Sequence, residues 1–165
     1  MKKISIIIGM LLTTFILAYA TSPPIKIDDY QPKNHDEKAI KQLLVKLQEG
    51  YNTYNPEIVL AAHAAGASIG GSGTILSKEE YVHVVPRRLA KSKELGLKIY
   101  FYAPQHIDIK EDSGKVKVPY DLIFDSIKYS EKGFFKAKLV KEQSNWLISE
   151  SRWKVTEKIG KWPLK

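Results

Sequence analysis

The sequence predicts an α+β domain in which helices cover one face of an antiparallel sheet. Apolar residues recur at spacings of three and four between Ala39 and Tyr54, which indicates a long amphipathic helix. From Leu97 onward the apolar spacing changes to two, and short polar turns separate the alternating segments, which is typical of an antiparallel meander. The chain has 165 residues, enough for one domain with a substantial core.

Residues 1–20 are predicted to be a signal peptide. Two lysines precede an apolar segment, residues 4–17, and Ala-Tyr-Ala at 18–20 forms an A-x-A cleavage site. We expect cleavage after Ala20 by a bacterial Sec-type pathway, with export to the periplasm or the outside. The alternative is an uncleaved membrane anchor, although the apolar segment is shorter than the roughly 20 residues that a spanning helix needs.

The chain is basic. Its formal net charge is +8, from 26 basic and 18 acidic side chains, and removal of the two signal lysines leaves 24 basic side chains and a charge of +6. The lysines alternate with apolar residues, as on a solvated face, and no basic cluster contains interleaved aromatic residues. We therefore expect the charge to serve mainly solubility, and we predict no nucleic acid partner.

Several catalytic and metal-binding motifs are missing from the sequence. There are no cysteines, which excludes disulfides, thiolate nucleophiles and cysteine metal sites. Histidine pairs at metal-binding spacing and the G-x-S-x-G elbow of serine hydrolases are also absent. The glycines at 70, 71 and 73 lack the lysine and the following helix that a phosphate-binding loop requires. We therefore predict no metal and no cofactor.

The first predicted elements follow an extended leader, residues 21–35, which contains three prolines. Asn34 can cap a helix that has an acidic first turn, and this helix is expected to run for about 19 residues. Pro56 suits the first turn of a second, short helix. That second helix is expected to extend to His63 and to be ended by Gly66.

A third helix is predicted after a short strand at 67–70 and a loose glycine turn. The sequence Ser-Lys-Glu-Glu at 77–80 is a capping box, so the helix should begin there and run to about Ser92. Pro86 is expected to kink or divide it.

The remaining strands are predicted from their alternation. One covers 97–109 with Pro104 at a bulge or an edge, and one covers 116–124. A closing hairpin covers 133–155, with a polar turn at its middle. The basic tail, residues 156–165, is expected to be loosely packed.

Two local motifs carry a resemblance to a known family. The segment Thr74–Tyr81, TILSKEEY, resembles the start of that family's third helix, and Asn145–Ile148, NWLI, resembles its last strand. Together with the order of elements over residues 36–155, they resemble the nuclear transport factor 2-like superfamily, and within it the SnoaL-like branch. The resemblance implies a cystatin-like cone, in which a strongly bent antiparallel sheet wraps around the long N-terminal helix and leaves a cavity at the wide end. Family members use this cavity as isomerases, dehydratases, cyclases and epoxide hydrolases, and others are non-catalytic binding or dimerisation modules.

Four candidate site residues come from the first helices and the sheet. Tyr51 and Tyr54 could line the cavity with hydroxyls, or belong to the core, as aromatic residues at helical spacing often do. His63 could act as a general base near the cavity, or be a helix-terminal histidine favoured by the helix dipole. Asp121 could serve as a base beside a tyrosine, as carboxylates on the sheet do in the family, or face solvent among the neighbouring lysines.

Three further candidates lie on the last strand. Trp146, Ile148, Glu150 and Arg152 follow one another at steps of two, so a regular strand places all four on one face. If Trp146 faces the core, Glu150 and Arg152 reach the mouth of the cavity and could orient a polar ligand. The alternative is an ordinary ion pair near the end of the sheet.

These observations lead to three functional hypotheses. The first is an exported domain that binds a small apolar or amphipathic ligand, or a protein partner, without established catalysis. The second is a SnoaL-like isomerase, dehydratase or cyclase that transfers protons in the cavity. The third is a module that forms homodimers through the exposed sheet face, with Tyr100, Tyr102 and Phe134 as candidates for that face. No integral membrane segment is expected after signal cleavage.

Overall fold

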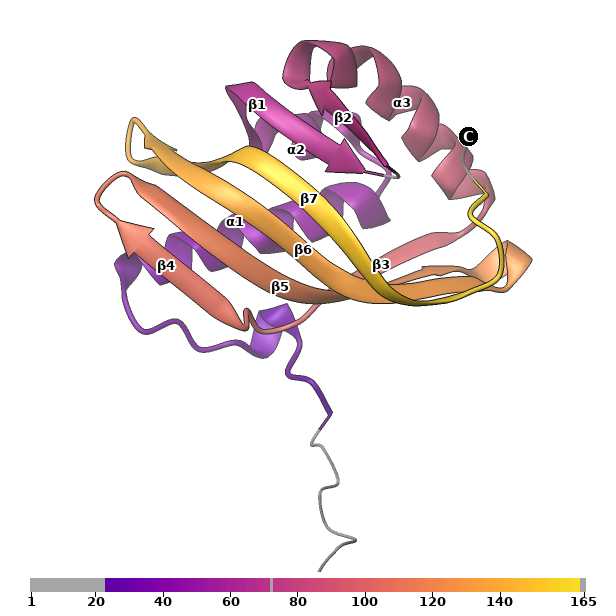
Figure 1. Cartoon of the computed structure of the whole chain (residues 1–165), viewed down its shortest axis with the longest axis horizontal. Coiled ribbons are helices and arrows are strands. Elements are labelled where there is room, and N and C mark those ends of the chain that lie inside the picture. The colour runs from indigo at the N-terminus through magenta and orange to yellow at the C-terminus, as the bar shows by residue number, and fades with distance from the viewer. Residues whose placement is uncertain (1–22, 72, 164–165) are drawn as a thin grey trace, which may run out of the picture.

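The computed structural model describes residues 23–71 and 73–163 (Figure 1), so the predicted signal peptide lies outside the described residues. The described part contains three α-helices and a seven-stranded sheet. The helices are α1 His35–Asn52, α2 Pro56–Ala61 and α3 Lys78–Glu94. The strands are β1 His63–Gly71, β2 Thr74–Ser77, β3 Leu97–Phe101, β4 His106–Lys110, β5 Ser113–Phe124, β6 Tyr129–Glu142 and β7 Asn145–Ile159. No helix within these residues combines the length and the apolar character needed to cross a membrane.

The sheet is open and strongly bent, and α1 lies along its concave face (Figure 1). Its strand order is β2-β1-β7-β6-β5-β3, with β4 also paired to β5. All neighbouring strands are antiparallel except β1 and β7, which are parallel. The predicted α+β cone, with a bent sheet around the long N-terminal helix, is confirmed.

Helix α1 forms as its sequence predicts. The side chain of Asn34 accepts a hydrogen bond of 2.8 Å from the backbone N–H of Glu37, which satisfies one of the free donors of the first turn. Ile40, Leu44 and Leu47 on the apolar stripe are completely buried against the sheet. Burial of one such side chain contributes on the order of 2 kcal/mol.

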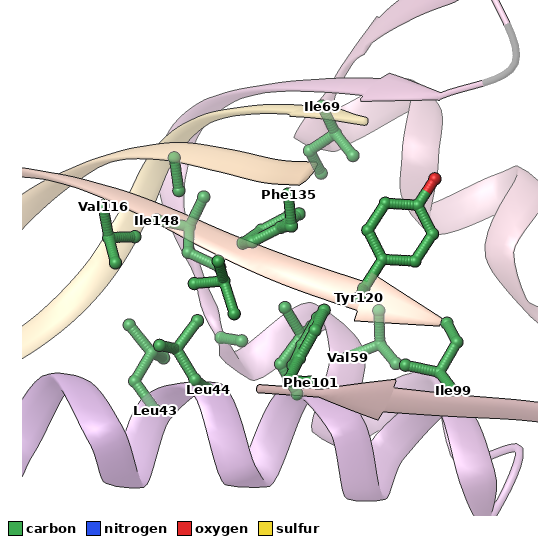
Figure 2. Close-up of a cluster of buried hydrophobic side chains, with 14 of the residues drawn as sticks. Leu43, Leu44, Val59, Ile69, Ile99, Phe101, Val116, Tyr120, Phe135 and Ile148 are labelled. Carbon is green, nitrogen blue, oxygen red and sulfur yellow. The ribbon is translucent and has the colours of Figure 1, made fainter. Parts of the chain in front are cut away.

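The core fills the space between α1 and the concave face of the sheet (Figure 2). On β5 every second residue from Val116 to Phe124 is buried, as the alternation predicts. The rings of Phe101, Phe135 and Trp153 pack together, with centroids 4.8 to 5.8 Å apart. This aromatic cluster joins β3 to the closing hairpin of β6 and β7.

Strand β1 corrects the predicted second helix. Helix α2 ends at Ala61, and His63 is the first residue of a strand, where it pairs with Ile148 of β7. The extension of the helix to His63 and Gly66 is therefore wrong. The alanine-rich segment favours helix locally, but it pairs with β7 instead: His63 lies opposite Ile148, and the N–H of Ile148 donates to the carbonyl of Ala62.

Pro86 does not divide α3, which continues as one helix on both sides of it. Proline removes the backbone N–H that would bond to the carbonyl of Val82, but both residues are exposed, so water can satisfy that carbonyl. The strand expected at 97–109 is two strands, β3 and β4, that both pair with β5. Between them residues 102–105 lie opposite only two residues of β5, so Pro104 stands at a bulge, as predicted.

Both ends of the domain are held more closely than predicted. In the leader, Ile27 is completely buried, and the N–H of Ala103 donates to the carbonyl of Ile25 at 2.7 Å. At the other end β7 continues to Ile159, and the ring of Trp162 then packs against two aromatic rings of the core. The described part of the tail is thus paired with β6, although the side chains of residues 156–162 remain exposed, as expected of a loosely packed segment.

Candidate functional site

A cavity of about 110 Å³ lies between α3 and the concave face of the sheet. For comparison, an engineered apolar cavity of about 150 Å³ binds benzene. The space therefore suits a molecule with roughly one ring. Its wall is mainly apolar, with contributions from Ile69, Gly70, Gly71, Val85, Leu89, Leu97, Ile99, Leu122, Phe124, Trp153 and Trp162.

The polar part of the wall is concentrated on two helices. Tyr51 comes from the last turns of α1, while Tyr81, Arg88 and Ser92 come from α3. The α3 residues share one helical face, because they are separated by seven and four residues, spacings that return to the same side of an α-helix. The capping box at Ser77 fixes where this helix begins and so supports the α3 part of the polar wall.

The two tyrosines meet inside the wall. The hydroxyl oxygens of Tyr51 and Tyr81 are 3.3 Å apart and share a hydrogen bond. Burial raises the pKa of both phenols, and the nearby positive charge of Arg88 offsets part of that rise. Both phenols are therefore protonated at neutral pH and act as hydrogen-bond donors or acceptors rather than as bases.

His63 lies behind this wall instead of in it. Its ring packs edge-on against Tyr81, and its Nδ1 lies 2.8 Å from the carbonyl oxygen of Val59. Because a carbonyl only accepts, Nδ1 carries the proton. Burial lowers the pKa of His63 to about 4, so the imidazole is neutral at physiological pH. His63 therefore binds a carbonyl near the end of α2, as the helix-terminal alternative expects, but without the positive charge that a helix dipole would favour.

Tyr54 and Trp146 have structural partners. The hydroxyl of Tyr54 donates to the carbonyl of Leu97 at 3.0 Å, which fixes the end of α1 to β3. Trp146 is buried near the start of α1, where its Nε1 donates to Asp36 at 2.9 Å. Lys141 donates to the same carboxylate oxygen, also at 2.9 Å. Neither predicted site residue lines the cavity.

A β-bulge overturns the predicted face of Glu150 and Arg152. Ile148 pairs with Leu139 of β6, but Glu150 pairs with Lys138, so Ser149 is an extra residue in β7. Side-chain alternation reverses at this point. Glu150 and Arg152 therefore face away from the core, where Glu150 forms an ion pair of 2.6 Å with Lys138. The next residues of the inner face are Ser151 and Trp153, and Trp153 lines the cavity.

Asp121 also belongs to the outer face of the sheet. Its carboxylate accepts a hydrogen bond of 2.9 Å from the Tyr102 hydroxyl. The outer face is rich in cations, since Lys117, Lys136 and Arg152 stand directly opposite one another on three neighbouring strands. The residues suggested for a homodimer, Tyr100, Tyr102 and Phe134, lie on this face, and the Lys117 ammonium sits 3.9 Å above the Phe134 ring centre.

Of the seven predicted site residues, the structure places only Tyr51 in the cavity wall. Sequence reasoning missed Tyr81 and Arg88, although their spacing from the capping box could have revealed them. It also missed Trp153, because no local signal marks the bulge. In residues 23–71 and 73–163, no three histidine, aspartate or glutamate side chains gather in a metal-binding arrangement.

Glu131 is a second group that sequence reasoning missed. It is buried on the inner face of β6 and pairs in register with the cavity residue Leu122. Each of its carboxylate oxygens accepts a hydrogen bond from a tyrosine hydroxyl, one from Tyr120 at 2.8 Å and one from Tyr129 at 2.5 Å. Burial and the carboxylate together raise the pKa of both phenols. The sequence contains one sign of this position. Glu131 alternates with Tyr129 and Phe135, which places its side chain on the same face of the strand as these aromatic residues.

Comparison with known proteins gives a fold but no close relative. No family model matches the chain, and no curated protein matches it. Among solved structures, an NTF-2-like protein of unknown function from Shewanella oneidensis MR-1 aligns with a TM-score of 0.62 and 17% identity over 72% of this chain and 98% of its own.

Two other similar structures bear enzyme names. A scytalone dehydratase-like protein from Novosphingobium aromaticivorans DSM 12444 aligns with a TM-score of 0.66 and 12% identity, over 78% of this chain and 89% of its own. A ketosteroid isomerase-like protein from Shewanella frigidimarina NCIMB 400 aligns with a TM-score of 0.58 and 16% identity, over 70% of this chain and 94% of its own. At these identities the likeness concerns the fold alone.

Proposed function

We propose that this chain, which has the nuclear transport factor 2-like fold, binds a small and largely apolar molecule in the cavity beside α3. The observation that carries the proposal is the cavity itself, about 110 Å³ in volume, with an apolar wall and one polar side. Concave, mostly apolar sites with a few convergent polar groups are typical of small-molecule binding. Membership of the SnoaL-like branch stays a prediction.

The same geometry supports binding over proton transfer by the predicted groups. Tyr51 is in the cavity wall, His63 lies behind it, and Asp121 lies on the opposite face of the sheet. The wall formed by the described residues contains neither a carboxylate nor an imidazole. A general base must come within hydrogen-bond reach of the proton that it removes.

Proton transfer is a second candidate function because of Glu131. A buried carboxylate beside the cavity, held by the hydroxyls of Tyr120 and Tyr129, has the chemical groups of an isomerase or dehydratase. In that case the ligand would displace one hydroxyl from the carboxylate. If Glu131 transfers protons, Glu131→Gln should abolish turnover of the ligand but keep its binding. If the protein only binds the ligand, neither the wild type nor Glu131→Gln should turn it over.

Export is part of the proposal and rests on the sequence of residues 1–20. N-terminal sequencing of the protein recovered from the periplasm or the medium of a bacterial host tests it. We expect the mature chain to begin at Thr21. A chain that keeps Met1 and remains with the membranes contradicts the cleavage.

Toluene is a suitable first probe because it has one ring and no charge. We expect it to raise the melting temperature in a concentration-dependent way, and to shift the amide resonances of cavity residues. Val85→Phe adds bulk to the wall and should abolish both effects. Val82→Phe, on the exposed side of the same helix, is the matched control. Equal responses of both variants and the wild type would exclude this cavity as the site.

A further inference from the structure

Arg88 is a cation in the wall of an otherwise apolar cavity. It is half-buried on α3, on the same helical face as Tyr81 and Leu89. The ion pairs found among the described residues involve Asp36, Glu94 and Glu150, and none of them involves Arg88. A charge next to apolar surface is unfavourable unless an opposite charge compensates it. The cavity wall therefore places a guanidinium beside apolar side chains, where a bound anion would compensate its charge.

The tyrosine pair supplies a second donor at the same place. Tyr51 and Tyr81 have two hydroxyl protons between them, and the single hydrogen bond that joins the hydroxyls uses one. The other proton is left to donate to a third group. Arg88 lines the same wall as both tyrosines and follows Tyr81 by two helical turns on one face of α3. Its charge also offsets part of the rise that burial causes in the pKa of both phenols.

We propose that the ligand of this cavity is a small organic acid, whose carboxylate binds Arg88 and the free hydroxyl of the tyrosine pair. Its apolar part, about one ring in size, contacts the aliphatic and aromatic wall. This inference rests on the proposed function and names the class of ligand for the same site.

The charge and the shape of the site select a monoanion. Arg88 is the one cation among the lining residues that the structure describes, so a dianion would keep an uncompensated charge beside apolar side chains. A planar carboxylate matches the parallel N–H groups of a guanidinium. A neutral molecule of the same size would fill the cavity but leave the charge of Arg88 without a partner.

Benzoate and benzamide test this inference because they differ little in shape and differ in charge. Titration calorimetry of the folded, mature protein should show that benzoate binds about tenfold or more tightly than benzamide. Arg88→Leu should weaken benzoate binding by about 10- to 100-fold and leave benzamide binding nearly unchanged. Arg88→Lys keeps the charge but not the planar donors, so its affinity for benzoate should be intermediate.

Arg87→Leu is the matched control, since it removes the same charge from an exposed neighbouring position of α3. It should bind benzoate like the wild type. Equal affinity of the wild type for benzoate and benzamide, or full benzoate affinity in Arg88→Leu, would overturn the inference while toluene binding keeps the cavity proposal intact. If toluene also fails to bind, the cavity proposal itself is wrong.

Discussion

Replacement of His63 by asparagine should remove a large part of the acid sensitivity of this fold. The imidazole is almost completely buried, and burial holds its pKa at about 4 against an ordinary value of 6.5. Between these two values the unfolded chain binds a proton that the folded chain excludes. The contribution of His63 to stability is therefore fully present above pH 6.5 and is lost as the pH falls towards 4.

The size of the effect follows from the pKa difference. One pKa unit corresponds to about 1.4 kcal/mol. Between pH 7.5 and pH 4.5 the folded state should lose about 2.5 kcal/mol of unfolding free energy through this residue. That is a large fraction of the roughly 5 to 15 kcal/mol that stabilises a typical domain. In His63→Asn the amide can still donate to the Val59 carbonyl but does not titrate.

Urea denaturation at the two pH values measures this difference directly. The wild type should lose about 2.5 kcal/mol more than His63→Asn on acidification, with unchanged dependence on urea concentration. His83→Asn, at an exposed position of α3, should keep the pH dependence of the wild type. If His63→Asn and the wild type lose the same free energy, the imidazole is not held neutral by burial.

Three further predictions concern the bulge, the cap and the outer face. Deletion of Ser149 alone removes the extra residue and keeps Trp153 facing the core, whereas deletion of Ser149 and Glu150 together should turn Trp153 outward and lower the unfolding free energy by about 3 to 5 kcal/mol; equal losses in the two variants would contradict the bulge. Ser77→Ala removes the N-cap of α3 and should lower stability by about 1 kcal/mol in urea denaturation, and no change would mean that the cap is dispensable. A homodimer through Phe134 and its neighbours would bring Lys117 of two copies together, so sedimentation should show a dimer that strengthens with salt; one that salt weakens would refute this geometry.

The parts of the fold that the sequence predicts are those with local signals. The apolar stripe of α1, the capping box of α3 and the alternation of β5 each depend on residues close together in the chain. The strand expected at 67–70 is the second half of β1, but its first half has no such signal, because the partner strand β7 lies at the other end of the domain. Parallel pairing with a remote strand decides the conformation of residues 63–66, and single-sequence reasoning has no access to it.

The site was less predictable than the fold for a related reason. The alternation from Trp146 to Trp153 looks regular in the sequence, and the extra residue Ser149 becomes visible only when β6 is placed beside β7. Because of this one extra residue, Trp153 faces the cavity, and Glu150 and Arg152 face away from it. Tyr51 was identified because it lies on the helical stripe, which needs no partner strand to be recognised.

The buried leader makes the order of assembly differ from the order of synthesis. Ile27 is completely buried, and the leader is held by a bridge between Lys26 and Tyr102 and by bonds from Lys41 to two leader carbonyls. Half of the contacts that hold the leader come from residues that are synthesised long after the leader itself. The N-terminal edge of the domain therefore closes late, and the chain keeps apolar surface exposed until its middle has been made. If the chain is exported as we propose, this late closure would leave the leader unpacked during translocation.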